Sequence, residues 1–242
     1  MNDATVKRLN AINREFYCLT AVSFDETRQR AWPGWDRLLP LLPPSLAVLD
    51  VGCGNGRFGV FLASRFALRY HGIDSSPDLL ALARNALPDA GFEERDIVES
   101  PPDSGQYDLV ALFGVLHHIP GADRRLRLLR ILAERVTPGG MLAVASWRFY
   151  EFERFRRRIL PWPPDLADEV EDHDYLLDWR RDAAAEPAIR YCHYVDDAEQ
   201  SRLVAASGLE PILSYRADGS TGDLNSYVIL RAPSAPLREG EG

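Results

Sequence analysis

The chain has 242 residues, of which 46% are hydrophobic and 26% are charged. This length and apolar content support one full hydrophobic core, and they favour a single α/β domain with an insertion over two domains. The net charge of −8 disfavours a protein that coats itself broadly with nucleic acid. The three cysteines, Cys18, Cys53 and Cys192, form no C-x-x-C pair, so the sequence predicts neither a disulfide framework nor a zinc site.

The apolar runs bear on cellular location. Residues 1–10 lack the apolar core of a signal peptide, and the longest apolar runs, such as 109–116, are too short to cross a bilayer. Together with the cysteine pattern, this predicts a cytoplasmic protein with no membrane partner.

The arginines are unevenly distributed. They are concentrated in residues 124–130 and 148–158, whereas residues 165–182 are strongly acidic. Lys7 is the only lysine, so the arginine excess partly reflects a compositional bias. We interpret the arginine groups as solvated helix faces rather than a nucleic-acid footprint, and a local RNA contact stays open as the alternative.

Residues 1–45 are expected to form an N-terminal helical cap, with helices over 4–16 and 35–42 separated by prolines. From residue 46 onward, short apolar strands alternate with helices. We predict strands at 46–51, 69–73, 92–95, 107–113 and 141–147, and helices at 57–66, 77–86 and 122–136. This alternation predicts a mostly parallel sheet covered on both faces, with ligands bound at the carboxyl ends of its strands.

Residues 148–190 interrupt this alternation with prolines and charges, and we interpret them as an insertion that contributes an element on the substrate side. A helix at 196–207 and strands at 209–216 and 226–231 complete the sheet. Residues 46–232 are therefore expected to form a doubly wound, seven-stranded Rossmann-like domain, followed by a flexible tail at 233–242.

The first strand leads into a glycine-rich turn with the sequence D-V-G-C-G-N-G at positions 50–56. Glycines at alternate positions permit positive φ and let a ligand approach the backbone amides. Residues 54–59 also satisfy the G-x-G-x-x-G pattern, so a nicotinamide or flavin cofactor competes for this loop. The carboxylate of Asp50 would repel the pyrophosphate of such a cofactor, and it suits a ligand that carries positive charge.

The D-x-G-x-G-x-G string resembles motif I of the class I methyltransferases that use S-adenosylmethionine (SAM) and release S-adenosylhomocysteine. Asp74 ends the second strand, roughly 20 residues further on, where a carboxylate can accept hydrogen bonds from ribose hydroxyls. The resemblance implies an adenine site at the end of the third strand. The cofactor-binding residues that we predict are Asp50, Gly52, Cys53, Gly54, Asn55, Gly56, Asp74, Ser75, Asp96, Ile97 and Phe113.

Two adjacent histidines, His117 and His118, follow the fourth strand. We expect one to be held by the backbone and the other to line the pocket. No metal is expected, because metal sites need three or four ligands and no further His or Cys stands at a matching spacing nearby. A general-base role for a histidine is left open, since its side chain titrates near neutrality.

Several further strings resemble one subfamily, the wobble-uridine tRNA methyltransferases of the Trm9 and AlkB-homologue-8 type. The chain departs from that pattern in the arginine at position 57, the cysteine at position 192, a shorter insertion and an acidic net charge. The strings that carry the resemblance are S-F-D-E-T-R-Q-R-A-W-P at 23–33, V-L-H-H at 115–118, P-W at 161–162, R-Y-C-H at 190–193 and D-L-N-S-Y-V at 223–228.

This resemblance implies that a carboxylate on a modified uridine becomes a methyl ester. An anionic nucleophile needs no general base, so the enzyme has to orient it and pair its charge, which the planar fork of arginine does well. The resemblance also leaves room for a small activating protein partner. The predicted catalytic residues are Arg28, His117 and Arg148, and the predicted acceptor-binding residues are Arg30, Trp32, His118, Trp147 and Asn225.

The predicted function is therefore O-methylation of a carboxylate, with tRNA as the first candidate acceptor and a small acidic molecule as the second. Three alternatives stay open from the sequence. They are a methyltransferase for another small molecule, an NAD-type oxidoreductase, and a SAM-binding module without catalytic activity.

Overall fold

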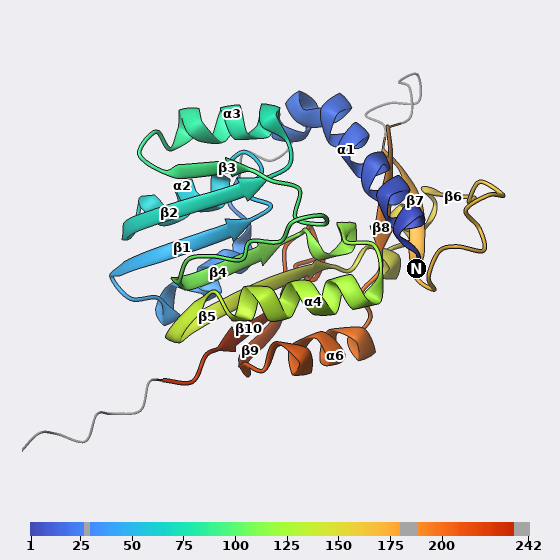
Figure 1. The fold of residues 1–242 in the computed structure, drawn as a ribbon. Coiled ribbons are helices and arrows are strands. Elements are labelled where there is room, and N and C mark those ends of the chain that lie inside the picture. Colours follow the sequence, from blue (N-terminus) through green and yellow to red (C-terminus); the bar gives the residue numbers. More distant parts are fainter. Residues whose placement is uncertain (27–29, 180–187, 235–242) are drawn as a thin grey trace, which may run out of the picture.

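The computed structural model describes residues 1–26, 30–179 and 188–234. Its main body is a seven-stranded sheet with the strand order β3-β2-β1-β4-β5-β10-β9 (Figure 1). The strands from β3 to β5 run parallel, and β10 is antiparallel to both β5 and β9. The prediction of a doubly wound, mostly parallel sheet is confirmed.

The elements of this layer follow the predicted alternation. Its strands are β1 (Ser45–Val51), β2 (Ala67–Asp74), β3 (Gly91–Glu94), β4 (Tyr107–Phe113), β5 (Val136–Trp147), β9 (Glu210–Ala217) and β10 (Asn225–Arg231). Its helices are α2 (Arg57–Ala63), α3 (Pro77–Ala86), α4 (Ala122–Ala133) and α6 (Asp197–Ser207), and short 3-10 turns lie at η1 (Pro33–Arg37), η2 (Leu39–Leu41) and η3 (Leu116–His118).

Strand β1 shows why the sheet is covered on both faces. Its residues are buried from Leu46 onward, and alternate side chains enter different cores. Leu49 packs in the core beneath α4 and α6, whereas Val48 packs in the core that contains Trp35 and residues of α2. Because successive strand side chains point to opposite faces, a continuously apolar strand requires a layer on each side.

Local signals fix several helix ends. The Ser76 hydroxyl accepts a hydrogen bond from the Leu79 amide (3.3 Å), and Pro77 occupies the first turn of α3. Asp196 caps α6 in the same way through the Glu199 amide (2.7 Å), and Gly208 ends this helix in the left-handed conformation.

Four predicted helices have different bounds in the structure. The helix expected over 4–16 is the longer α1 (Asp3–Glu26), and the one expected over 57–66 ends at Ala63. The helix expected over 35–42 consists of the two 3-10 turns η1 and η2, because Pro40 has no amide proton to donate within an α-helix. The helix expected over 122–136 ends at Ala133, because Val136 already pairs with Tyr107 as part of β5.

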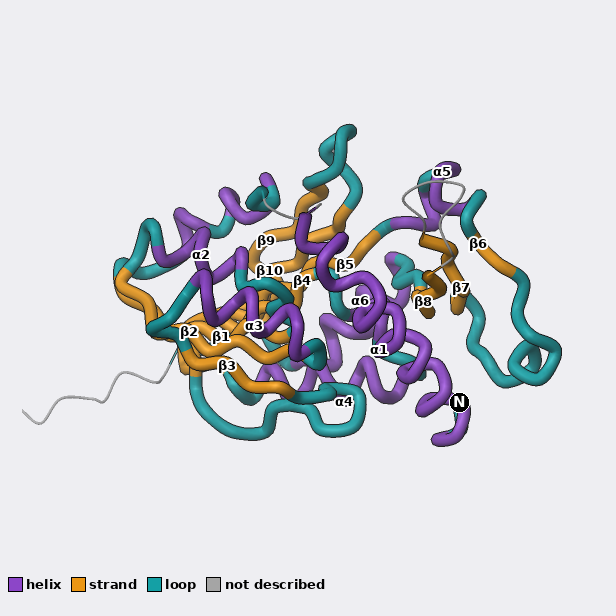
Figure 2. The backbone as a smooth tube through the Cα atoms, turned by 90° about the horizontal axis from the view of Figure 1, so that it is seen from above, coloured by secondary structure: helices purple, strands orange, loops and turns teal. Residues whose placement is uncertain are grey.

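Strands from residues 159–179 and 188–193 form a second, three-stranded antiparallel sheet. It contains β6 (Ile159–Leu160), β7 (Asp174–Trp179) and β8 (Ala188–His193), and it is preceded by η4 (Phe149–Glu151) and α5 (Glu153–Arg156). The first helix, α1 (Asp3–Glu26), packs along β8, and Leu9 shares a small core with Leu176 and Tyr191. Segments that are far apart in the sequence therefore lie side by side next to the main sheet (Figures 1 and 2).

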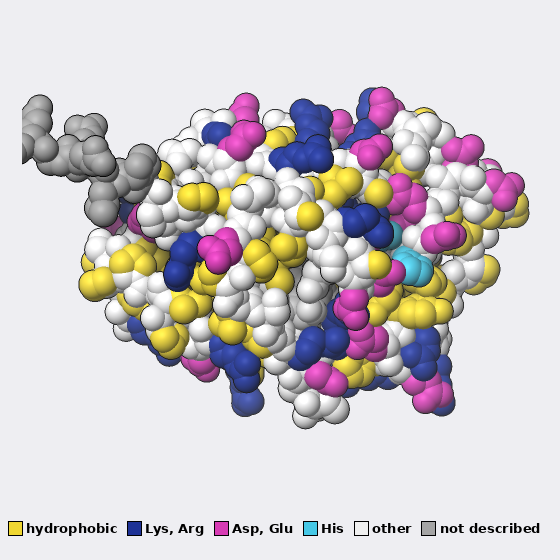
Figure 3. All heavy atoms as spheres, turned by 90° about the horizontal axis from the view of Figure 1, so that it is seen from below, with side chains coloured by type: hydrophobic (Ala, Val, Ile, Leu, Met, Phe, Trp, Pro, Cys, Tyr) yellow, Lys and Arg dark blue, Asp and Glu magenta, His cyan; other side chains and the backbone are white. Residues whose placement is uncertain are grey.

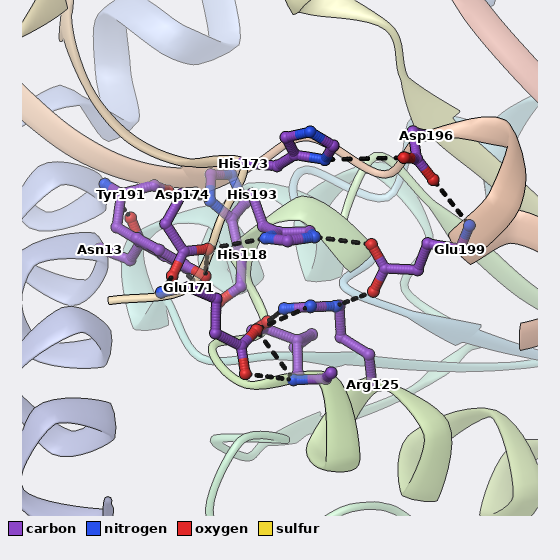
Figure 4. A network of polar contacts seen from close by, with 12 residues as sticks. Asn13, His118, Arg125, Glu171, His173, Asp174, Tyr191, His193, Asp196 and Glu199 are labelled. Carbon is purple, nitrogen blue, oxygen red and sulfur yellow. Dashed lines mark hydrogen bonds and ion pairs between the residues drawn. The ribbon is translucent and has the colours of Figure 1, made fainter. Parts of the chain in front are cut away.

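A buried polar network joins this small sheet to the main domain (Figure 4). The imidazole of His193 lies between Asp174 (Nδ1 to Oδ1, 2.7 Å) and Glu199 (Nε2 to Oε2, 2.6 Å). Arg125 of α4 donates from Nε to the other oxygen of Glu199 (2.6 Å) and from Nη2 to Glu171 (3.0 Å). The network thus connects β7 and β8 with α4 and α6.

The network also explains part of the arginine-rich stretch at 124–130. Arg125 is 1% exposed within it, and Arg124 pairs with Asp3 of α1 (2.6 Å). On the face shown in Figure 3, basic and acidic side chains are interspersed rather than separated by sign. These two arginines therefore have structural roles.

Within the described residues, no helix has both the length and the apolar character needed to cross a bilayer.

Candidate active site

A cavity of about 710 Å³ opens at the carboxyl ends of β1, β2 and β4. This is the edge where parallel α/β sheets bind their ligands, and the volume lies in the usual range for small-molecule sites. Its walls come from the glycine-rich loop, the strand ends, α1, the 30–35 segment, the β9–β10 turn and Arg190 of β8. The small sheet and the N-terminal helix thus complete a site on the main domain.

The three glycines of the loop lie in different surroundings, so a side chain would be disfavoured at each for a different reason. Gly52, Gly54 and Gly56 all have positive φ, at 75°, 55° and 76°. A Cβ on Gly52 would lie 2.2 Å from a methyl carbon of Val115, whereas one on Gly54 would meet no atom within 4 Å. Gly56 packs against Ala83 of α3 instead of lining the cavity. Gly54 therefore leaves the loop backbone open to a ligand, and Gly56 allows close helix packing.

Asp50 is a buried carboxylate at the end of β1. It accepts a hydrogen bond from the Tyr70 hydroxyl (2.5 Å) and lines the cavity. Burial raises the pKa of Asp50 to about 7, and the nearby Asp74 acts in the same direction, although the Tyr70 hydrogen bond opposes this shift. A cationic ligand beside Asp50 would restore its ordinary ionisation.

Asp74 and Asp96 stand at the ends of β2 and β3. Asp74 accepts hydrogen bonds from the amides of Gly54 (2.8 Å) and Ser76 (2.9 Å), and burial raises its pKa. Asp96 accepts from the Asn10 side chain (2.7 Å) and from the Val98 amide (3.0 Å). Both carboxylates are held by neutral donors, and each carboxylate has about four lone-pair sites in all, so each can accept a further hydrogen bond from a ligand.

The other predicted cofactor residues fall at the same cavity. The structure brings together Cys53, Asn55, Ser75, Ile97 and Phe113 with the acidic residues. Gly56 alone among the predicted set is absent from the wall.

Arg190 was not among the predicted site residues. It is 8% exposed and lines the cavity, and its guanidinium carbon lies 4.6 Å from the ring centre of Trp147 and 5.3 Å from that of Phe16. Its Nε is buried without a hydrogen-bond partner among the residues that the structure describes. The R-Y-C-H string was the only sequence signal for it.

The arginines that the sequence singled out have different positions. Arg148 lies outside the cavity wall, because its guanidinium is bound to Glu151 (2.7 Å), Asp197 (2.8 Å) and the Val195 carbonyl (2.8 Å). The prediction that it faces the acceptor is therefore corrected. Arg30 does line the cavity and is exposed. Arg28 lies outside the described residues.

Both histidines line the cavity, and both contact other side chains or the backbone. His118 donates from Nδ1 to the Tyr191 carbonyl (3.0 Å), so its Nε2 accepts from the Tyr17 hydroxyl (2.9 Å). His117 lies against the Trp147 ring, with ring centres 5.3 Å apart. The fold also brings Cys192, which is distant from these histidines in the sequence, within 4.8 Å of donor atoms of both.

Trp32, Trp147 and Asn225 also line the cavity, as predicted for the acceptor side. The sequence reasoning missed a row of side chains on α1 with helical spacing. These are Asn10, Asn13, Arg14 and Tyr17. A polar and aromatic stripe at that spacing was a readable signal, although nothing in the sequence said what it faced.

Residues 48–140 match the family model described as "Methyltransferase domain". This part of the chain is similar to methyltransferase domains. The match begins within β1 and ends within β5, so it contains the glycine-rich loop and the three acidic strand ends. The predicted methyltransferase class is confirmed at this level.

Curated relatives of this domain have different acceptors in their names. The chain is 36% identical to the trans-aconitate 2-methyltransferase of Methylobacterium nodulans, over 57% of this chain and 54% of that protein. It is 32% identical to mouse tRNA (carboxymethyluridine(34)-5-O)-methyltransferase ALKBH8, over 55% of this chain and 19% of that protein. The human probable tRNA methyltransferase 9B is 28% identical, over 64% of this chain and 34% of that protein. The matched part thus spans about half or less of these relatives.

Solved structures of methyltransferases share the fold over most of the chain. A SAM-dependent methyltransferase from Clostridium acetobutylicum has a TM-score of 0.66 at 12% identity, covering 90% of this chain and 99% of that one. SAM-bound CalS10, an amino pentose methyltransferase from Micromonospora echinaspora, has a TM-score of 0.62 at 21% identity, covering 87% of this chain and 95% of that one. At these identities the likeness concerns the fold of the methyltransferase domain and its surrounding elements.

Proposed function

We propose that this protein is a SAM-dependent methyltransferase that transfers a methyl group to a carboxylate oxygen. The match to the methyltransferase domain supports the reaction class. The observation that carries the acceptor class is the buried guanidinium of Arg190, whose Nε has no acceptor among the described residues.

The cavity fits the chemistry of SAM. Asp50 supplies negative charge for the ammonium of its methionine part, Asp74 supplies lone pairs for ribose hydroxyls, and Ile97 offers an apolar surface beside Asp96 for adenine. The open position at Gly54 leaves room for the cofactor to approach the backbone. When bound, SAM supplies an electrophilic methyl group on a sulfonium, which an ionised carboxylate can take without losing a proton.

A carboxylate acceptor needs orientation and charge pairing. The rings of Trp147 and Phe16 restrict the Arg190 guanidinium, so its planar fork is held ready for a carboxylate. Because the anion is already nucleophilic, neither His117 nor His118 has to remove a proton. We assign them to the wall that shapes the acceptor site.

Among carboxylates, a carboxymethyl group on the wobble uridine of tRNA is our first candidate, and a small carboxylic acid is the second. Two relatives name such acceptors, carboxymethyluridine and trans-aconitate. The aromatic side chains of Tyr17, Trp32 and Trp147 in the wall suit an unstacked base, because aromatic stacking is the usual way of holding single-stranded nucleotides.

A methyl-transfer assay with labelled SAM tests the proposal. The acceptors are an anticodon stem-loop with 5-carboxymethyluridine at the wobble position, the same RNA with plain uridine, and trans-aconitate. We expect label in the first RNA or in the small acid, and none in the plain-uridine control. Calorimetry that detects binding of NAD but not of SAM would support an oxidoreductase instead. SAM binding without transfer to any carboxylate would contradict the carboxylate acceptor, and it would fit either a methyltransferase for another small molecule or a non-catalytic module.

The raised pKa of Asp50 predicts a pH dependence of cofactor binding. Its carboxylate is mostly protonated below pH 7 and has to ionise to pair with an ammonium, so affinity rises with pH. We expect S-adenosylhomocysteine to bind about tenfold more weakly at pH 6 than at pH 7.5 in calorimetric titrations. Asp50→Asn should bind weakly at both values. An affinity of the unaltered protein that is flat over this range would contradict the assignment.

A further inference from the structure

Hydrogen bonds hold the segment 32–35, which contains Trp32, against the edge strand β9 and the turn that follows it. The Gly34 amide donates to Asp218 (2.8 Å), and the Gly34 carbonyl accepts from the Tyr215 hydroxyl (2.7 Å). A Cβ on Gly34 would lie 2.5 Å from the ring of Tyr227, so that ring packs directly on the glycine. Both polar groups of this backbone position are thus satisfied by β9 and the turn that follows it, while β10 contributes the packing of Tyr227.

Asp218 is unusual in its burial and its backbone. It is 4% exposed and adopts φ of 69°, a left-handed conformation that costs energy for a residue other than glycine. Besides the Gly34 amide, it accepts hydrogen bonds from the Asn225 side chain (2.8 Å) and the Tyr227 hydroxyl (2.6 Å). The strained turn therefore aims one carboxylate at three donors, one of which belongs to the N-terminal segment.

The segment held in this way covers the end of the sheet. The Trp32 ring stacks on Trp35, with ring centres 5.5 Å apart, and it lies 3.0 Å from where a Cβ on Gly114 would be. The guanidinium carbon of Arg57, at the start of α2, lies 4.9 Å from the Trp32 ring centre. Trp32, Pro33 and Asp218 all line the cavity. A shift of the 32–35 segment would therefore change the shape of the cavity next to β4.

We infer that Asp218 is a positioning residue for methyl transfer, which fixes Trp32 in the acceptor wall through the Gly34 amide. It acts through the backbone of the segment and is assigned no contact with the transferred group. The kinetic part of this inference rests on the proposed function. The structural part, the placement of Trp32 by Asp218, does not.

A spectroscopic experiment tests the structural part without any acceptor. The protein contains five tryptophans, so 5-fluorotryptophan labelling should give five fluorine resonances, with that of Trp32 assigned by Trp32→Phe. Asp218→Gly removes the carboxylate and keeps the positive φ accessible. We expect the Trp32 resonance to shift or broaden while those of Trp162 and Trp179 stay in place. Asp223→Gly, in the same turn, is the matched control and should leave Trp32 unchanged.

Kinetics test the catalytic part with whichever carboxylate the methyl-transfer assay identifies. We expect Asp218→Gly to raise the KM for the acceptor by about tenfold or more and to change the affinity for S-adenosylhomocysteine less than about twofold. Asp218→Asn tolerates the same backbone conformation and can still accept from the Gly34 amide, so its effect should be smaller.

Three results would overturn the inference. An unmoved Trp32 resonance in Asp218→Gly would show that the carboxylate does not place the ring. Collapse of all five resonances in both Asp218→Gly and Asp218→Asn, with Asp223→Gly unaffected, would assign Asp218 to global stability. An equal loss of cofactor and acceptor binding would remove its specific link to the acceptor wall. Absence of any methyl acceptor would defeat the proposed function, yet it would leave the fluorine result able to decide the placement of Trp32.

Discussion

Replacing Arg190 with alanine is expected to lower kcat/KM for a carboxylate acceptor by about 100-fold or more, because removing one partner of a buried charge pair costs roughly 2–5 kcal/mol. Affinity for S-adenosylhomocysteine should stay within about twofold, since Arg190 enters the cavity from β8, whereas the glycine loop and the acidic residues belong to the main sheet. Steady-state kinetics with calorimetric cofactor binding measure both quantities.

Two further variants sharpen this expectation. Arg190→Lys keeps the positive charge but loses the planar fork that stacks on Trp147, so it should recover only part of the lost activity. Arg127→Ala removes an exposed arginine of α4 and should leave the kinetics unchanged. If Arg190→Ala turned over every accepted carboxylate as fast as the unaltered protein, the pairing role assigned to Arg190 would be wrong.

The second large effect concerns stability. Glu199→Ala is expected to lower the free energy of unfolding by about 3–5 kcal/mol, because it leaves the buried guanidinium of Arg125 without its closest carboxylate. Urea denaturation measures this change. Glu153→Ala, which removes an exposed partner of Arg157, is the control and should hardly alter the midpoint. Equal losses in the two variants would contradict the importance given to the network.

The same network predicts a pH dependence of stability. Burial acts to lower the pKa of His193, but hydrogen bonds to Asp174 and Glu199 outweigh it and raise the pKa above the ordinary value of 6.5. The contribution of His193 is therefore complete below pH 6.5 and is lost as pH rises through the raised pKa. The contribution of Glu199, which accepts from His193, has the opposite dependence on pH. Burial acts to raise the pKa of Glu199, but His193 and Arg125 lower it to about 2, so its contribution is present above pH 4.5 and is lost as pH falls toward 2.

His193→Gln isolates the first of these terms. The difference in free energy of unfolding between this variant and the unaltered protein should be largest between pH 5 and 6.5 and should shrink as the pH rises further. A difference that is constant from pH 5 to pH 9 would show that protonation of His193 does not stabilise the fold.

The sheet and the cofactor side of the cavity were predictable because their signals are local. The buried run of β1 leads directly into the glycine turn, and Ser76 with Pro77 marks the start of α3 within a few residues of Asp74. Strand ends of a parallel sheet meet at one edge, so placing Asp50, Asp74 and Asp96 together required only the order of the elements.

The acceptor side was less predictable because it depends on contacts between distant segments. Arg190 enters the cavity only because β8 pairs with β7 and packs against α1, which begins at Asp3. Arg148 does follow the end of β5 at the correct edge, but nearby Glu151 and Asp197 bind its guanidinium away from the cavity. A strand-end rule gives the position of a backbone, and the partners of a long side chain decide where its charge lies.

The most direct test of the account is the chemical nature of the product. The methyl-transfer assay should be followed by mild alkaline treatment of the labelled acceptor and by mass analysis before and after it. A methyl ester predicts a gain of one methyl group that base removes as labelled methanol, with the original carboxylate restored. Label that survives base, as on a nitrogen, a carbon or an ether oxygen, would contradict the assignment of a carboxylate acceptor.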